Sequence, residues 1–171
     1  MPPIPPESKS FRERGQAAME FALVLIPLLL CVSGAVDMGF IFSNREAIIN
    51  AARDGARYAT THPTAWSNAA SPAINTIEGQ ILNDSGSASV SNDDNHISIT
   101  YLTSTGTRCG NYSVSSNGFV AQTGYTQTTC LVPGSLIQVQ VTYQYHILTP
   151  LIGQIFSNVN ITSTATMVEE Q

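Results

Sequence analysis

The stretch that decides the fold is FALVLIPLLLCVSGAV, which occupies residues 21–36. Asp37 interrupts this apolar run, which then resumes as far as Phe42. A membrane-spanning helix needs about 20 mostly apolar residues, and the segment from Ala17 to Val36 meets that requirement. Pro27 is expected to kink the helix, which membrane helices tolerate. Asp37 is interpreted as a residue at the outer membrane–water interface.

The helix is expected to continue beyond the membrane, because apolar residues recur there at a spacing of three to four. They are Ile41, Ile48, Ala52, Ala56 and Ala59. His62-Pro63 should end the helix, since the residue before a proline is disfavoured in the helical conformation. The sequence therefore predicts a transmembrane part at residues 16–42 and an amphipathic continuation at residues 43–62.

Residues 63–171 are interpreted as one exported domain. Ser71-Pro72 is typical of a helix start, and Ile74 to Leu82 is typical of a short amphipathic helix. Alternating patterns predict strands at residues 96–102, 136–147 and 159–168. The expected class is α+β, with a small antiparallel sheet packed on the long helix.

Two segments of this domain have weaker patterns. Residues 103–134 are rich in Ser, Thr, Gly and Asn, which predicts a loop with short strands near residues 112–114 and 118–121. Residues 148–156 are apolar and are expected to form a short helix or a covering loop.

Charge sets the expected topology. Lys9, Arg12 and Arg14 precede the apolar run, so the positive-inside rule places residues 1–15 in the cytoplasm as a leader and the remainder outside. After Arg57 the basic side chains, histidines aside, reduce to Arg108. This distribution excludes a basic face on the exported domain, and therefore argues against nucleic acid as a partner.

Cys109 and Cys130 lie in the exported part, where disulfides persist. We expect them to form one bridge that staples the loop at residues 103–134 and contributes about 3 kcal/mol. Two alternatives stay open. The cysteines could be free buried thiols, or they could bind zinc with His96 and His146, although these histidines lack ligand-like spacing.

Glu20 lies at the mouth of the apolar run, where a carboxylate is costly. The cost is on the order of 2.5–3.5 kcal/mol at a membrane helix centre and smaller near its end. If the chain were cut after Gly15, Gln16 would carry a new ammonium one helical turn from Glu20. With a pKa of roughly 7.7–8.0, that group would be largely charged near neutral pH and could pair with Glu20 of its own or a neighbouring helix.

The basic residues followed by Gly15, Gln16, Glu20 and Phe21 resemble the type IV prepilin signal, with Glu at the fifth mature position and Phe after it. Residues 20–30 and 50–59 are similar to TadE-like pseudopilins of the tight-adherence (Flp) pilus system. The resemblance runs from about residue 12 to residue 60. It returns at residues 136–145, 148–151 and 161–168.

This resemblance implies a pilin-like fold and a place in the bacterial inner membrane, with an exported C-terminal domain that could enter a surface pilus. It implies a minor pseudopilin that aids pilus assembly, adhesion and biofilm formation. The implied partners are a prepilin peptidase, other pilin or pseudopilin subunits, the pilus assembly machinery and the membrane.

The sequence gives no support for catalysis. His62, His96 and His146 are scattered, and no nucleophile elbow, P-loop or paired-metal motif is present. Residues 92–95 (Asn-Asp-Asp-Asn) could contact calcium, but without the Gly and distant Glu of an EF-hand loop a solvated turn is expected. We therefore expect no enzyme activity, no cofactor and no metal site.

Other interpretations stay open. The chain could be an uncleaved, membrane-anchored envelope protein. It could also be a soluble domain released by signal peptidase after Ala35, since Ser33-Gly34-Ala35 offers the small residues that such cleavage needs. An exported carbohydrate-binding or enzymatic domain is a further alternative, which no site in the sequence supports.

Overall fold

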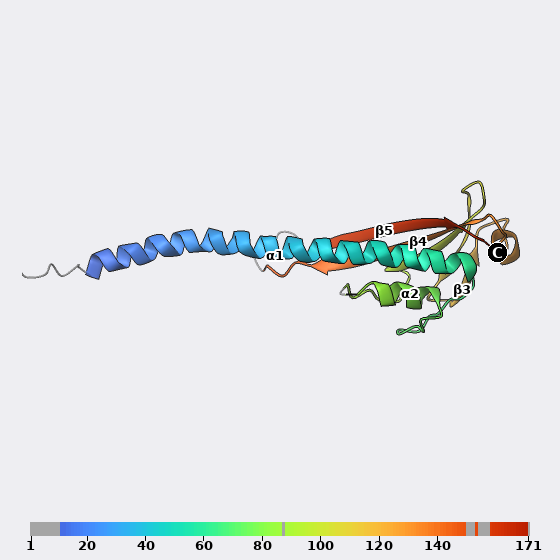
Figure 1. Cartoon of the computed structure of the whole chain (residues 1–171), viewed down its shortest axis with the longest axis horizontal. Coiled ribbons are helices and arrows are strands. Elements are labelled where there is room, and N and C mark those ends of the chain that lie inside the picture. Colours follow the sequence, from blue (N-terminus) through green and yellow to red (C-terminus); the bar gives the residue numbers. More distant parts are fainter. Residues whose placement is uncertain (1–10, 87, 150–152, 154–157, 171) are drawn as a thin grey trace, which may run out of the picture.

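The structure is a computed structural model that describes residues 11–86, 88–149, 153 and 158–170. The described residues form three helices and five strands. In chain order they are α1 (Phe11–Thr61), α2 (Ile77–Asp84), β1 (Ile97–Leu102), β2 (Arg108–Ser113), β3 (Gly118–Ala121), α3 (Gln127–Cys130), β4 (Leu136–His146) and β5 (Asn158–Val168). Figure 1 shows that the first half of α1 projects alone, whereas its second half lies along the sheet beside α2.

The strands form one antiparallel sheet in the order β3-β2-β1-β4-β5. The two long strands β4 and β5 pair without a break from Leu136↔Val168 to His146↔Asn158. The expected strands at residues 96–102, 136–147 and 159–168 are confirmed, and so is the α+β class. The short helix or covering loop that was expected at residues 148–156 lies largely outside the described residues.

Helix α1 supplies a stripe of small and apolar residues to the core. Ile48, Ala52, Ala56 and Ala59 are fully buried, as their spacing predicted. The helix stays helical through Pro27 and ends at Thr61, immediately before the His62-Pro63 pair that was expected to stop it. Its buried face packs against α2, β4 and β5.

Gly55 is the point of closest approach on this stripe. A Cβ atom there would lie 2.4 Å from Cγ1 of Ile81 on α2 and 3.6 Å from Cγ1 of Val139 on β4. Small residues at positions 51, 52, 55, 56 and 59 therefore let the helix lie close to both of its neighbours.

The predicted start of the second helix at Ser71-Pro72 was wrong. Helix α2 begins at Ile77, and Thr76 is its N-cap, whose Oγ1 accepts a 3.1 Å hydrogen bond from the Gly79 N–H. Residues 73–76 instead form a turn that packs so closely on the helix that a Cβ at Gly79 would lie 1.9 Å from the Ala73 carbonyl oxygen. Ile74 is consequently exposed.

The expected loop at residues 103–134 is more ordered than its composition suggested. β3 has the predicted bounds, but β2 begins earlier, at Arg108, and pairs with both β1 and β3. A Cβ at Gly110 would lie 2.1 Å from Cζ of Phe119, so this glycine gives the aromatic ring its space.

The expected disulfide is present. Cys109 on β2 and Cys130 at the end of α3 are bonded, both are buried, and their Cα atoms lie 5.7 Å apart. The bridge fixes α3 against the outer part of the sheet. Cys31, on the apolar part of α1, is exposed and lies outside this bridge.

Candidate membrane anchor and assembly site

The N-terminal part of α1 brings the predicted processing residues onto one exposed helical segment. Gln16 Nε2 donates a 3.1 Å hydrogen bond to Glu20 Oε1, which places position 16 one helical turn before the carboxylate. Among the described residues, a Cβ at Gly15 would meet nothing within 4 Å beyond its own turn of helix, and Phe21 is exposed. Arg12 and Arg14 lie within α1, whereas Lys9 lies outside the described residues.

The next part of α1 is long and apolar enough to cross a membrane. Its large apolar side chains are exposed to the surroundings rather than buried in the domain. They include Leu23, Val24, Ile26, Leu28, Leu29 and Val32. A projecting helix with this surface is compatible with a membrane anchor.

Asp37 joins this apolar helix to the globular domain. Its Oδ1 accepts hydrogen bonds from Tyr145 Oη at 2.9 Å and from the Leu148 N–H at 3.0 Å. Its Oδ2 accepts from the Thr149 N–H at 3.2 Å and from Thr149 Oγ1. The side chain is buried, so the end of β4 and the residues after it are fixed to α1 at this point.

From the sequence, Asp37 was interpreted only as a residue at the membrane–water interface, and its hydrogen bonds to Tyr145, Leu148 and Thr149 were not predicted. A signal for them was present, because Asp37, Ile41, Asn44 and Ile48 follow the same helical spacing as the buried stripe. Asp37 therefore continues the domain-facing side of α1 toward the apolar half of the helix. A buried carboxylate in that position needs donors, and Tyr145 on β4 and the residues after that strand supply them.

A second buried carboxylate lies at the opposite end of the domain. Glu78, on α2, is 0% exposed, and its Oε2 accepts a 2.9 Å hydrogen bond from the Ser67 N–H. Its Oε1 has no hydrogen-bond partner among the described residues. Burial raises the pKa of Glu78 to about 7, because desolvation disfavours the carboxylate more than its backbone hydrogen bonds favour it.

Trp66 directly precedes Ser67, the residue whose N–H donates to Glu78. Its Nε1 donates a 2.7 Å hydrogen bond to Tyr101 Oη, which in turn donates to the Pro63 carbonyl oxygen at 2.6 Å. The Trp66 ring also stacks on Tyr112 with centroids 5.1 Å apart. The segment that follows α1 is therefore held on the sheet by aromatic and hydrogen-bond contacts.

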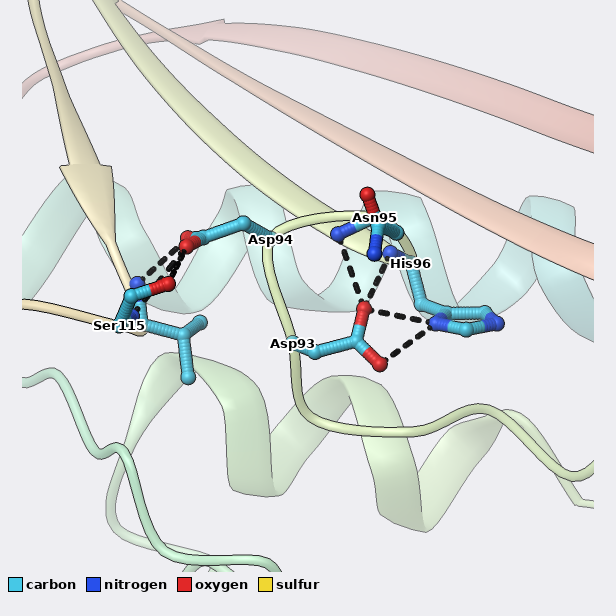
Figure 2. Close-up of polar contacts among 6 residues, drawn as sticks. Asp93, Asp94, Asn95, His96 and Ser115 are labelled. Atoms are coloured by element: carbon cyan, nitrogen blue, oxygen red, sulfur yellow. Dashed lines mark hydrogen bonds and ion pairs between the residues drawn. The ribbon is translucent and has the colours of Figure 1, made fainter.

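The carboxylates of the acidic turn at residues 92–95 accept hydrogen bonds from other residues of the same chain (Figure 2). Asp93 Oδ1 accepts from the backbone of Asn95 and His96 and lies 2.7 Å from His96 Nδ1. Asp94 accepts from the Val114 N–H at 2.6 Å and from the Ser115 N–H and hydroxyl. These bonds join the turn before β1 to the turn between β2 and β3, which gives the acidic residues a structural role.

The described residues contain no group of three or more His, Cys, Asp or Glu side chains placed to hold a metal ion. The predicted site residues that the structure describes lie in two places. Gly15, Gln16, Glu20 and Phe21 lie together near the start of α1, and the disulfide lies in the domain. Asp37, which the sequence did not mark as a site residue, lies between these two places.

Comparison with known proteins identifies the N-terminal part of the chain. The family model described as TadE-like protein matches residues 15–57, which include the apolar part of α1 and much of the stripe that packs on the domain. This segment is therefore similar to TadE-like proteins, as the sequence resemblance predicted, and TadE-like proteins are components of Tad pilus systems. A search of curated proteins and a search of solved structures each found no match.

Proposed function

We propose that the protein is a minor pseudopilin of a tight-adherence (Flp) pilus, anchored in the inner membrane by α1 and active in pilus assembly and adhesion. The observation that carries the proposal is the TadE-like match from residue 15 to residue 57, which covers the projecting helix and its junction with the domain. The exported domain is larger than an anchor alone requires, which favours a minor or tip component over a bulk subunit.

In this proposal a prepilin peptidase cuts after Gly15 on the cytoplasmic side. Lys9, Arg12 and Arg14 keep the leader at the inner leaflet by the positive-inside rule. Gly15 is exposed, and a Cβ there would meet nothing within 4 Å among the described residues beyond its own turn of helix, which suits access by a peptidase.

Cleavage would give Glu20 a partner. The new α-amino group of Gln16 would lie one turn before the carboxylate, in the (i, i+4) relation that the 3.1 Å Gln16–Glu20 hydrogen bond already marks. Within an apolar surround, pairing with this ammonium or that of a neighbouring subunit would offset the cost of the charge. Glu20 thereby becomes a residue that aligns subunits.

The proposed role is structural rather than catalytic, without a cofactor. The expected contacts are with other pilin or pseudopilin subunits and the assembly machinery. The match on both sides of Ala35 supports an anchor that is retained, against release of a soluble domain after Ala35.

The deciding experiment is determination of the mature N-terminus by mass spectrometry of membrane and sheared-surface fractions. A start at Gln16 is expected in the wild type, and the leader should stay attached in Gly15→Ala. Gly39→Ala is the matched control, because Gly39 also lies on α1 without close neighbours.

A mature start at Val36 would replace the proposal with ordinary secretion, and an intact leader in the wild type would leave a membrane-anchored envelope protein. Glu20→Ala should still be cut but should reduce piliation. Normal piliation of that variant would remove the proposed role of Glu20.

A further inference from the structure

The apolar surface of α1 continues past the length that one bilayer requires. At about 1.5 Å per residue, the helix from Ala17 to Val36 spans about 30 Å, the thickness of the hydrocarbon layer. Yet Met38, Phe40 and Phe42 remain 54%, 49% and 58% exposed, and no charged side chain follows Asp37 on the helix before Arg45. This exposed apolar surface lies beside the globular domain rather than below it.

Leu148 extends the same surface onto the domain. Its N–H is held by Asp37 at 3.0 Å, whereas its side chain is 65% exposed. Leu148 and Thr149 also line an apolar groove of about 590 Å³ together with Ile26, Leu29 and Val36 of α1. The residues after β4 therefore reach alongside the outer part of the anchor.

We infer that the membrane-facing end of the domain is seated in the outer part of the bilayer that α1 crosses, with Leu148 inserted among lipid chains. Asp37 is the positioning residue, because its hydrogen bonds to Tyr145, Leu148 and Thr149 hold this end of the domain against the helix. The inference rests on the membrane anchoring in the proposed function and adds a second point of lipid contact.

The arrangement of the exposed side chains favours lipid over a second protein surface. At about 100° per residue, Met38 and Phe42 point to one side of the Asp37 stripe and Phe40 points to the other. One flat protein partner would cover one of these sides, whereas a fluid hydrocarbon surround covers both together with Leu148. Continuity with the anchor therefore assigns the surface to the bilayer.

The test uses the full chain in vesicles of phosphatidylethanolamine and phosphatidylglycerol. Cys31→Ser removes the exposed cysteine, and single cysteines are then introduced as Leu148→Cys, Leu28→Cys and Val120→Cys and labelled with an environment-sensitive nitrobenzoxadiazole dye. All three replaced side chains are exposed, at 65%, 55% and 43%, so the substitutions leave the core intact. Nitroxide-bearing lipids then report contact with the acyl chains by quenching.

A blue-shifted emission and several-fold stronger quenching at position 148 than at position 120, on β3, are expected. Equal, weak quenching at 148 and 120 with strong quenching at 28 would overturn the inference while leaving the anchor intact. Weak quenching at 28 would overturn the anchor itself. A blue shift at 148 that disappears on dilution with unlabelled lipid would identify a second copy as the occupant and would also overturn the inference.

Discussion

Tyr145 Oη donates a 2.9 Å hydrogen bond to Asp37 Oδ1, which joins the end of β4 to α1 across 108 positions of sequence. Asp37 lies where the exposed apolar helix meets the domain, so this contact sets where the domain begins along the helix. The backbone donors of Leu148 and Thr149 complete the arrangement, which makes the stability of this end of the domain depend on one carboxylate.

Asp37→Ala should destabilise the domain by about 3 kcal/mol, because it leaves the donors of Tyr145, Leu148 and Thr149, two of which are buried, without an acceptor. Thermal unfolding of the full chain in detergent should shift down by about 2–4 °C per kcal/mol. Amide exchange at Leu148 and Thr149 should accelerate. Tyr145→Phe removes one donor and should cost about 1 kcal/mol.

The matched control for Asp37 is Asp54→Ala, an exposed aspartate on the same helix, which should change stability by about 0.5 kcal/mol or less. Equal effects of the two alanine substitutions would contradict the role given to Asp37.

Gly55→Ala should destabilise the packing of α1 on α2. Alanine gains about 1 kcal/mol over glycine in helix propensity, but the added Cβ would lie 2.4 Å from Ile81 Cγ1, and overpacking costs about 1–3 kcal/mol. The net effect should be a lower denaturation midpoint. Gly39→Ala, which meets no atom within 4 Å, should instead be neutral or slightly stabilising. A stabilised Gly55→Ala would show that Ile81 moves aside freely.

Cys109→Ser should reduce the free energy of unfolding by about 3 kcal/mol, because the bridge closes a loop of 21 positions in the unfolded chain. Denaturant unfolding followed by the fluorescence of Trp66, the one tryptophan of the chain, measures this loss. Cys31→Ser, at an exposed position outside the bridge, is the control and should leave the midpoint unchanged. Thiol labelling of the wild type should find Cys31 reactive and the other two cysteines protected; labelling of all three would refute the bridge.

Stability should fall as pH rises from about 4.5 to about 7, because the pKa of Glu78 is raised to about 7 by burial from an ordinary value of 4.5. Below that range the carboxyl is protonated in both states. Within it the unfolded chain releases the proton while the folded chain retains it, so unfolding becomes easier. A difference of one in pKa between the folded and unfolded chain corresponds to about 1.4 kcal/mol. The free energy of unfolding should therefore fall by a few kcal/mol over this pH range.

Glu78→Gln should flatten this part of the pH profile of the denaturation midpoint, again followed by Trp66 fluorescence. Glu46→Gln, at an exposed position on α1, should leave the wild-type slope in place. A slope that persists in Glu78→Gln would assign the pH dependence to another group.

Local sequence patterns predicted the elements whose burial follows a regular helical or strand period. The stripe from Ile48 to Ala59 and the alternation in β4 and β5 follow helix and strand periods, so their burial could be read from spacing. The Cys109–Cys130 bridge was predicted because the exported part contains two cysteines and disulfides persist outside the cytoplasm. The TadE-like match confirms the resemblance of the helix, while processing at Gly15 stays a prediction.

Features that depend on distant partners could not be read in this way. The donors to Asp37 come from residues more than 100 positions away, and only the finished sheet brings them to the helix. Nothing in the local sequence distinguishes Glu78 from a solvent-facing residue of an amphipathic helix, but α2 begins at Ile77 and buries Glu78 in the first turn. Both Ser71-Pro72 and Thr76 could start this helix, and local propensity did not decide between them. In the structure Thr76 is the N-cap.

The shared use of α1 by the anchor and the domain has a mechanical consequence. The second half of α1 runs along β4 and β5 (Figure 1). The buried residues from Ile48 to Ala59 belong to this part of the helix. If α1 is anchored as proposed, tension on it acts parallel to the packed interface and loads that interface in shear. The whole row of small side chains must slide past the sheet together, so a pull from the membrane is shared along the row instead of peeling the contacts apart one at a time.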